Sequence, residues 1–266
     1  TFAVKDVVDL VEPGDVSDFR PLDLALSHDG TTLYIADWGM GGWGNKTEKL
    51  GRVYALTHKG AASPAPRGQD SDPLDAQIAA LAHPARNERL RAQAAIQRQG
   101  PMALAAITRA LFDPETPAVA GRHLVWTIDG IAGGRPEASL PLIEALRSPQ
   151  AEIRAQAARA LGIRRVPIAA EPVRSLLTDP DPATRLEAII ASGRIADPET
   201  VADLVPLLGE EDRFLAFAAR QALRRIHDWN RVRQALDQAQ SPRVRLGVLE
   251  TLELVHELPA AQILID

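Results

Sequence analysis

Arginines recur at regular intervals in the second part of this sequence, and their chemistry is well defined. Arg154 is followed eight residues later by Gly162, and Arg185 is followed in the same way by Gly193. A guanidinium group can form two parallel hydrogen bonds with one carboxylate, and Asp-Pro or Ser-Pro turns precede these arginines. We therefore predict a structural ladder in which the arginines pair with turn aspartates; a ridge that binds an anionic partner is the alternative. The ladder comprises Arg91, Arg122, Arg154, Arg185 and Arg245.

No other side chains in this sequence are spaced for a known catalytic or metal-binding motif. The six histidines show no pair four residues apart and no HExxH, so we predict no metal site. The sequence has no cysteine, which excludes a thiolate nucleophile, a Cys-ligated zinc and covalently attached haem in this chain. It also has no P-loop, GxSxG or dinucleotide-binding fingerprint. We predict no catalytic residue.

The composition indicates a helical protein with thin layers. Of the 266 residues, 45% are hydrophobic but only 4% are aromatic, so alanine and leucine must provide the core. The formal net charge of -5 argues against a general nucleic-acid binder, which needs a basic face. No apolar run reaches the length of a membrane-spanning segment, and the first residues lack the layout of a signal peptide.

The elements that position the arginines repeat about every 31 residues from residue 74 onward. One unit is clearest after the turn at residues 179–182, which precedes a helix through residues 183–190. We expect this helix to end at Gly193, near a left-handed cap, and residues 197–200 to begin its partner. The partner helix carries an apolar stripe that consists of Val201, Leu204, Val205, Leu207 and Leu208.

Four side chains in the repeats are predicted to be buried. Leu161 and Ile189 occupy the apolar stripes of their helices and should lie between layers. Trp126 and Trp229 are interpreted as core residues rather than as aromatic side chains of a binding site.

This pattern of Asp-Pro, then Arg, then Ala-Ala and Leu-Gly resembles HEAT repeats of the short bacterial type. The resemblance covers residues 74–266 and implies a mainly α fold, a solenoid of about six helix pairs that binds other proteins. The last unit lacks a polar capping helix, so we expect the chain to be part of a longer protein.

The first 59 residues predict a small antiparallel β-meander. Strands are expected at residues 22–27, 33–37 and 52–56, and an Asp-Gly turn joins the first two. Three strands are too few to bury a core unaided. Residues 60–73 are rich in small residues and proline and are interpreted as a linker. The glycine-rich loop at residues 39–44 is either a functional loop or a disordered one. The Asn-Lys-Thr sequon at residues 45–47 is either a glycosylation site or a chance match.

The order of motifs in the meander resembles the last blade of a quinoprotein-type β-propeller. FRPLD at residues 19–23, ADW at residues 36–38 and GRVY at residues 51–54 carry the resemblance. The family is that of soluble glucose/sorbosone dehydrogenases, and above all the secreted "membrane-bound dehydrogenase" proteins. In these, a propeller precedes HEAT repeats and a c-type cytochrome domain. The resemblance implies a periplasmic or otherwise extracytoplasmic location.

By the same resemblance, the cofactor-binding candidates are Arg20, Asp23, Asp37 and Trp38. The family binds pyrroloquinoline quinone (PQQ) and calcium at the propeller axis, and haem c in the cytochrome domain. Those cofactors are implied for the parent protein, whereas this chain alone should bind none of them and should be inactive. A salt-bridge role between blades is the alternative for Arg20, and a role in capping the hairpin is the alternative for Asp37 and Trp38.

Two functions remain open from the sequence. In the first, the chain is an internal piece of a sugar or alcohol oxidoreductase, in which the repeats lie between the propeller and an electron acceptor. In the second, it is a stand-alone interaction scaffold of the phycobilin-lyase type with no redox role. Both give the solenoid a protein partner.

Overall fold

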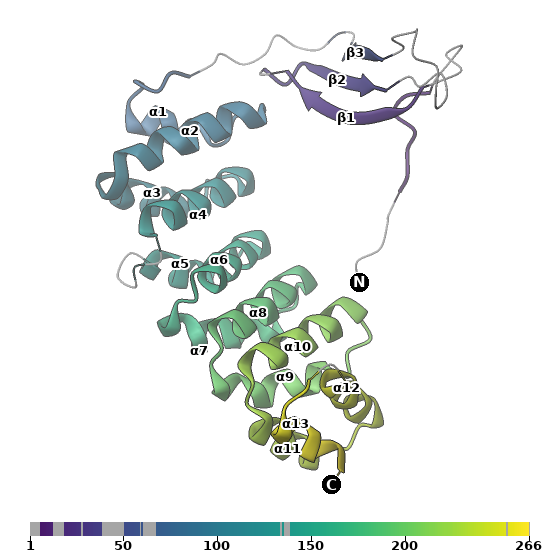
Figure 1. Ribbon diagram of the computed structural model, residues 1–266. Coiled ribbons are helices and arrows are strands. Elements are labelled where there is room, and N and C mark those ends of the chain that lie inside the picture. Colours follow the sequence, from purple (N-terminus) through teal and green to yellow (C-terminus); the bar gives the residue numbers. More distant parts are fainter. Residues whose placement is uncertain are drawn as a thin grey trace. The chain divides into compact units, whose positions relative to one another are not determined.

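The structure is a computed structural model, and it describes residues 6–12, 19–27, 29–38, 51–58, 60, 68–133, 135, 139–253 and 255–265. A small sheet precedes a long series of helices (Figure 1). The chain divides into two compact units, residues 3–95 and residues 96–266.

The sheet is the predicted antiparallel meander. Its strands are β1 (Pro21–Leu26), β2 (Thr32–Asp37) and β3 (Arg52–Thr57), in the order β1-β2-β3. In the turn between β1 and β2, Asp29 accepts hydrogen bonds from the Ser27 hydroxyl at 2.7 Å and from the hydroxyl and N–H of Thr31. These hydrogen bonds lower the pKa of Asp29 to about 2, and the bond from Ser27 has the largest effect.

One face of the sheet is apolar and open to solvent on the β1 side. Leu24 pairs with Ile35 and Leu26 pairs with Leu33, so these four side chains share a face. Ile35 is buried at 3% exposure, whereas Leu24 and Leu26 remain 59% and 55% exposed. The described residues therefore leave the β1 side of this face exposed to solvent.

Several predicted segments fall outside the described residues. These are the glycine-rich loop at residues 39–44, the sequon at residues 45–47 and most of the linker, residues 61–67. The helices begin at Leu74, as predicted, and the described residues after Thr57 include no strand.

The helices follow the sequence pattern closely. Short 3-10 turns lead into or out of three of the shorter helices: η1 (Gly100–Ala103), η3 (Pro167–Ala169), η4 (Ser175–Thr178) and η5 (Pro198–Thr200). The α-helices are α1 (Leu74–Ala80), α2 (Arg86–Gln99), α3 (Leu104–Leu111), α4 (Ala118–Ala132), α5 (Leu140–Ala145), α6 (Ala151–Arg164), α7 (Ala170–Arg174), α8 (Pro182–Ile195), α9 (Val201–Leu207), α10 (Arg213–Ile226), α11 (Trp229–Gln238), α12 (Pro242–Leu252) and α13 (Leu258–Ile265).

Within residues 96–266 the helices stack in two layers. The longer helices α4, α6, α8 and α10 follow one another in one layer, and the shorter α3, α5, α7 and α9 follow in the other (Figure 1). Leu161 of α6 and Ile189 of α8 are 0% exposed, which confirms their predicted burial. Each helix thus buries an apolar stripe against the next unit and against its own partner.

The prediction that the helix ends at Gly193 is wrong. Gly193 lies inside α8, which ends at Ile195 and is capped by Ala196 in the left-handed conformation at φ 61°. A Cβ on Gly193 would lie 2.6 Å from the Cα of Ala222, so this glycine allows α8 and α10 to approach closely. Gly162 has the same role against Ala191 of α8, again at 2.6 Å. In these two repeats the glycine eight residues after the arginine therefore marks close helix packing and not a helix end.

The two tryptophans of the repeats have different environments. Trp229 is buried at 3% exposure and its indole N–H donates to Glu257 Oε2 at 2.7 Å, so its predicted burial is confirmed. Trp126 is 36% exposed, and its assignment to the core is wrong. Its indole N–H donates to Gln156 Oε1 at 2.9 Å on the surface of the next long helix.

Candidate partner-binding surfaces

The strongest contact of the arginine ladder joins two successive repeats. Arg154 donates from Nε and Nη2 to both carboxylate oxygens of Asp179, at 2.7 and 2.8 Å. The side chains are 13% and 5% exposed. Burial alone would raise the pKa of Asp179, but the hydrogen bonds from Arg154 and from the Asp181 N–H hold it below its usual value. This is the pairing with a turn aspartate that the sequence predicted for Arg154.

The other arginines of the ladder have different partners. Arg185 donates to the backbone carbonyls of Asp179 and Pro180 in its own turn, at 2.8 and 3.3 Å. Arg245 likewise donates to the carbonyl of Ala239, at 3.2 Å. These two were expected to meet acidic side chains; instead they tie a helix to the turn before it.

Arg122 and Arg91 do form ion pairs, though not with turn aspartates of the ladder type. Arg122 of α4 pairs with Glu152 on the first turn of α6. Arg91 pairs with Asp70 at 3.3 Å and with the buried Glu88 at 3.0 Å.

Arg89, which the 31-residue spacing does not single out, makes the backbone contacts of a ladder arginine. Its Nη1 donates to the carbonyls of His83 and Pro84, both at 2.7 Å, which are the sixth and fifth residues before it. Arg154 and Arg185 make the same pair of contacts with their own turns. All three are the fourth residue of their helix. The distance from the helix start therefore marks the position, and in α2 it selects Arg89 and not Arg91.

We call the exposed surface of α4, α6, α8, α10 and α12 the long-helix face. On this face, polar side chains that are thirty residues apart in the sequence contact one another between neighbouring helices. Arg122 meets Glu152, and Trp126 meets Gln156 on the same two helices. Further along, Arg220 of α10 meets a glutamate of α12. These contacts hold the side chains of the face in fixed positions, which lowers the entropy cost of binding a partner.

Large apolar side chains stand beside these polar contacts. Phe217 of α10 is 56% exposed, and the Arg220 guanidinium lies 5.8 Å from its ring centre. On α12, Leu246 and Leu249 are 56% and 49% exposed. Aromatic and aliphatic side chains within a polar surrounding are the composition of a protein-binding surface.

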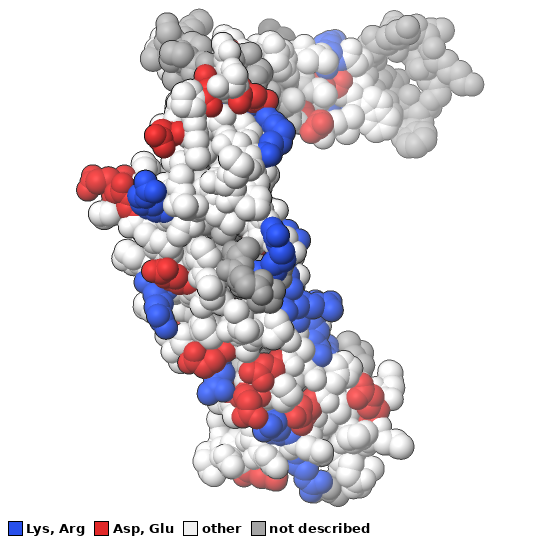
Figure 2. Space-filling view, turned by 90° about the vertical axis from the view of Figure 1, so that its left-hand side faces the viewer, with Lys and Arg blue, Asp and Glu red and all other residues white. Residues whose placement is uncertain are grey.

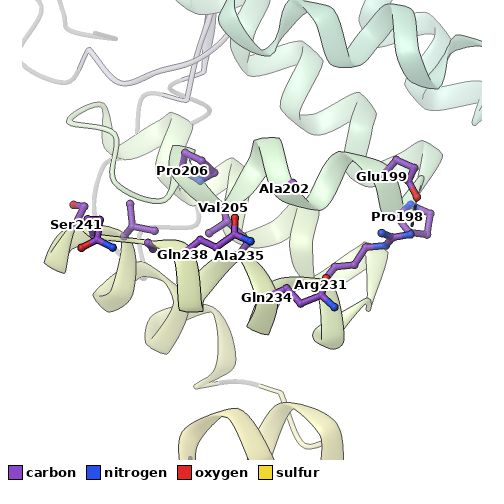
Figure 3. A pocket seen from close by; sticks show the side chains of 13 residues that line it. Pro198, Glu199, Ala202, Val205, Pro206, Arg231, Gln234, Ala235, Gln238 and Ser241 are labelled. Atoms are coloured by element: carbon purple, nitrogen blue, oxygen red, sulfur yellow. Dashed lines mark hydrogen bonds and ion pairs between the residues drawn. The ribbon is translucent and has the colours of Figure 1, made fainter.

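A separate hollow of about 400 Å³ lies between α9, α11 and the start of α12 (Figure 3). Arg231 at one end is neutralised by Glu199 at 2.6 Å and Asp228 at 3.0 Å. Gln234 and Gln238 lie on α11, the helix that also carries Arg231, and add their amides to the lining. With its charges paired, this hollow offers amide hydrogen bonds and apolar walls to a side chain or a small polar molecule.

Charge is unevenly distributed on the helical region. On the face that Figure 2 shows, basic side chains gather along one edge of its middle part, and acidic and basic side chains alternate below. Attraction for an anionic partner is therefore local, although the chain as a whole is acidic with a net charge of -5.

The four cofactor candidates lie at one end of β1 and β2. Asp37 is 4% exposed; its Oδ1 accepts the Arg20 N–H at 2.8 Å and its Oδ2 accepts the Tyr54 hydroxyl at 3.4 Å. The Arg20 carbonyl in turn accepts the Trp38 N–H at 3.1 Å. Asp37 thereby closes the end of the strand pair through hydrogen bonds to β3 and to the residue before β1.

The other candidates lie at the surface of the sheet. Asp23 accepts the N–H of Leu24 at 2.8 Å, and Trp38 is 53% exposed. The cofactor roles of Arg20, Asp23, Asp37 and Trp38 stay predictions. Among the described residues, no three His, Asp or Glu side chains are grouped as metal ligands, and no helix is long and apolar enough to cross a membrane.

Comparison with known proteins identifies the repeats. Residues 139–224 match the family profile for HEAT repeats. These residues include α6, α8 and the Arg154–Asp179 contact. The helical region is an α-solenoid, and its residues 139–224 have the HEAT-repeat pattern.

Three solved structures similar to this chain are a lyase complex, a designed armadillo repeat protein and an engineered protein. The complex of CpcE and CpcF of phycocyanin lyase from Nostoc sp. PCC7120 has a TM-score of 0.46 and 18% identity over 79% of this chain and 86% of that one. A designed armadillo repeat protein in complex with a (KR)4 peptide has 0.44 and 19% over 72% and 96%. An engineered protein has 0.42 and 20% over 71% and 92%. No curated protein matches the chain.

Proposed function

We propose that this HEAT-repeat chain is a scaffold that binds a protein partner on its long-helix face. The observation that carries the proposal is the combination, on one face, of exposed Trp126, Phe217 and Leu246 with side chains fixed by contacts between neighbouring helices. Preorganised aromatic anchors of this kind account for most of the binding energy in protein interfaces.

Site-specific photo-crosslinking tests this proposal. A photoreactive residue in place of Phe217 should give one discrete cross-linked product in the native host. The same residue in place of Met102, which is 89% exposed on η1 outside the face, should give none. Equal products from both positions, or no product from Phe217, would exclude the long-helix face as a docking surface.

At a finer level, we propose that the scaffold belongs to an extracytoplasmic quinoprotein-like dehydrogenase, in which the sheet is a propeller blade. The open apolar side chains of Leu24 and Leu26 support this, because a blade must pack against further blades. The parent protein would hold PQQ, calcium and haem c. We expect the 266-residue chain alone to hold none of these cofactors.

Reconstitution with cofactors, together with the mass of the native protein, distinguishes the dehydrogenase proposal from a stand-alone scaffold. The 266-residue chain with PQQ and Ca²⁺ should bind neither and should reduce no dye with any sugar or alcohol. The native protein should show the absorption spectra of quinone and haem and an intact mass above that of this chain. A native mass equal to the 28.7 kDa of this chain would favour the stand-alone scaffold instead.

A further inference from the structure

A pocket lined by arginines lies where α6, α8 and α10 end. Its volume is about 430 Å³. The residues around it are Ile163, Arg165, Gly193, Arg194, Ala196 and Arg225. Three of these six carry a guanidinium group, which is charged at all physiological pH values. The pocket is therefore a concentrated positive site on an acidic protein.

The pocket arginines differ from the arginines beside them in the sequence. Arg164 donates to an aspartate of α4 at 2.9 and 3.1 Å, and Arg224 donates to backbone carbonyls of α12. Within the described part of the chain, no acidic side chain forms an ion pair with Arg165, Arg194 or Arg225. A cation at a helix C-terminus offsets the helix dipole, but that effect does not require three of them around one hollow.

The spacing of the charges fits an extended chain. Arg194 and Arg225 occupy the same position in α8 and α10, 31 residues apart. Neighbouring packed helices are about 8–10 Å apart. One turn of a polyproline II helix contains three residues and advances about 9 Å. Carboxylates at every third residue of such a peptide would therefore repeat at the spacing of the arginines.

We propose that this pocket binds an acidic peptide segment of a partner protein, with carboxylates at every third residue. The proposal rests on the scaffold function and adds the chemistry of the partner. Each carboxylate meets one guanidinium in a two-point hydrogen bond. Ile163, which is 52% exposed, and Ala196 supply apolar surface for the residues between the carboxylates.

Fluorescence anisotropy with defined peptides tests the proposal on the 266-residue chain. The probe is labelled (Glu-Pro-Pro)4; the comparison peptides are (Gln-Pro-Pro)4 and a peptide of the same composition with its four glutamates adjacent. We expect binding of the first peptide only, or at least about ten-fold tighter binding of the first. Binding should weaken as salt is raised from about 50 mM to about 500 mM.

Matched variants assign the binding to the pocket. Arg194→Gln and Arg225→Gln should each weaken binding about ten-fold, the loss of one charge-assisted contact. The affinity of Arg194→Lys should lie between those of wild type and Arg194→Gln, because lysine keeps the charge but cannot form two parallel hydrogen bonds with a carboxylate. Arg109→Gln is the control, since Arg109 is also an arginine in a last helical turn, on α3. It should leave the affinity unchanged, and circular dichroism should show that every variant is folded.

Three outcomes would overturn the proposal. These are no binding of (Glu-Pro-Pro)4 at about millimolar concentration, an equal loss with Arg109→Gln, or displacement by free sulfate or phosphate as effective as by the unlabelled peptide. The last result would identify a site for a compact anion. If the Phe217 cross-link persists while the pocket variants have no effect, the scaffold function stands and the acidic-peptide site fails.

Discussion

Arg154 of α6 and Asp179 of the turn before α8 form a two-point ion pair between successive repeats, with N–O distances of 2.7 and 2.8 Å. Arg154 also donates to the carbonyl of Ser148 at 2.9 Å, so one guanidinium joins its own turn to the next one. Because both ionic groups are largely buried, removal of either leaves the other without a partner in a site poor in water.

Arg154→Ala should therefore lower the free energy of unfolding by about 2–4 kcal/mol. The partner cross-link from Phe217 should be unchanged, because Arg154 holds the stack together and does not lie among the residues that we assign to binding. Urea denaturation measures the first quantity. Arg109→Ala on α3 is the control, and it should change stability by less than about 0.5 kcal/mol. Loss of the cross-link without loss of stability would make the ladder a recognition ridge.

The same pair predicts a dependence of stability on pH. The pKa of Asp179 is lowered in the folded chain, so the unfolded state binds its proton more readily. The stabilisation is complete above the ordinary aspartate pKa of about 3.9 and is lost as the pH falls through the lower folded value. Asp179→Asn should be less stable than wild type at pH 7, and the difference should shrink toward pH 3. A difference that is the same at both values would contradict the prediction.

The interior between the layers predicts a second set of stability changes. Leu161→Ala and Ile189→Ala should each cost about 2–5 kcal/mol, because both side chains are fully buried. Ile163→Ala on α6 is the matched control; Ile163 is 52% exposed and should lose far less. Thermal denaturation followed by circular dichroism gives the comparison. Similar losses at all three positions would mean that the packing differs from that described.

Close helix packing makes a prediction for the glycines. Gly193→Ala should destabilise the chain by about 1–3 kcal/mol, because the new methyl group would meet the backbone of Ala222. Gly130→Ala is the control, since its new methyl group would meet only the flexible end of Gln97. There the higher helix propensity of alanine, about 1 kcal/mol, should offset the contact. Equal changes in the free energy of unfolding for Gly193→Ala and Gly130→Ala, measured by chemical denaturation, would contradict this prediction.

The sequence by itself determined the order and type of the elements. The three strands, the first helix at Leu74 and the 31-residue repeat all follow from local patterns of apolar and turn residues. These are properties of short segments, and packing in later layers does not change them. The burial of Leu161 and Ile189 was predictable for the same reason.

Only the tertiary structure decided which groups meet across the repeats. The turn position that holds Asp179 in one repeat is Ser148 one repeat earlier and Glu210 one repeat later. Arg154 therefore finds an aspartate, whereas Arg122 pairs with Glu152 and Arg185 donates to backbone carbonyls. The partner of each arginine depends on how far neighbouring helices are shifted along their axes and on which residue occupies one position of the turn.

Contacts between repeats also decide the role of the glycines, the exposure of Trp126 and the formation of the arginine pocket. Within one helix, a glycine that ends it and a glycine that another helix contacts look alike, so Gly193 was assigned to the wrong role. The exposure of Trp126 depends on which side of α4 the next helix covers. Arg194 and Arg225 are ordinary helix-end residues in the sequence, and they become a site only because the stack places the ends of successive helices around one hollow.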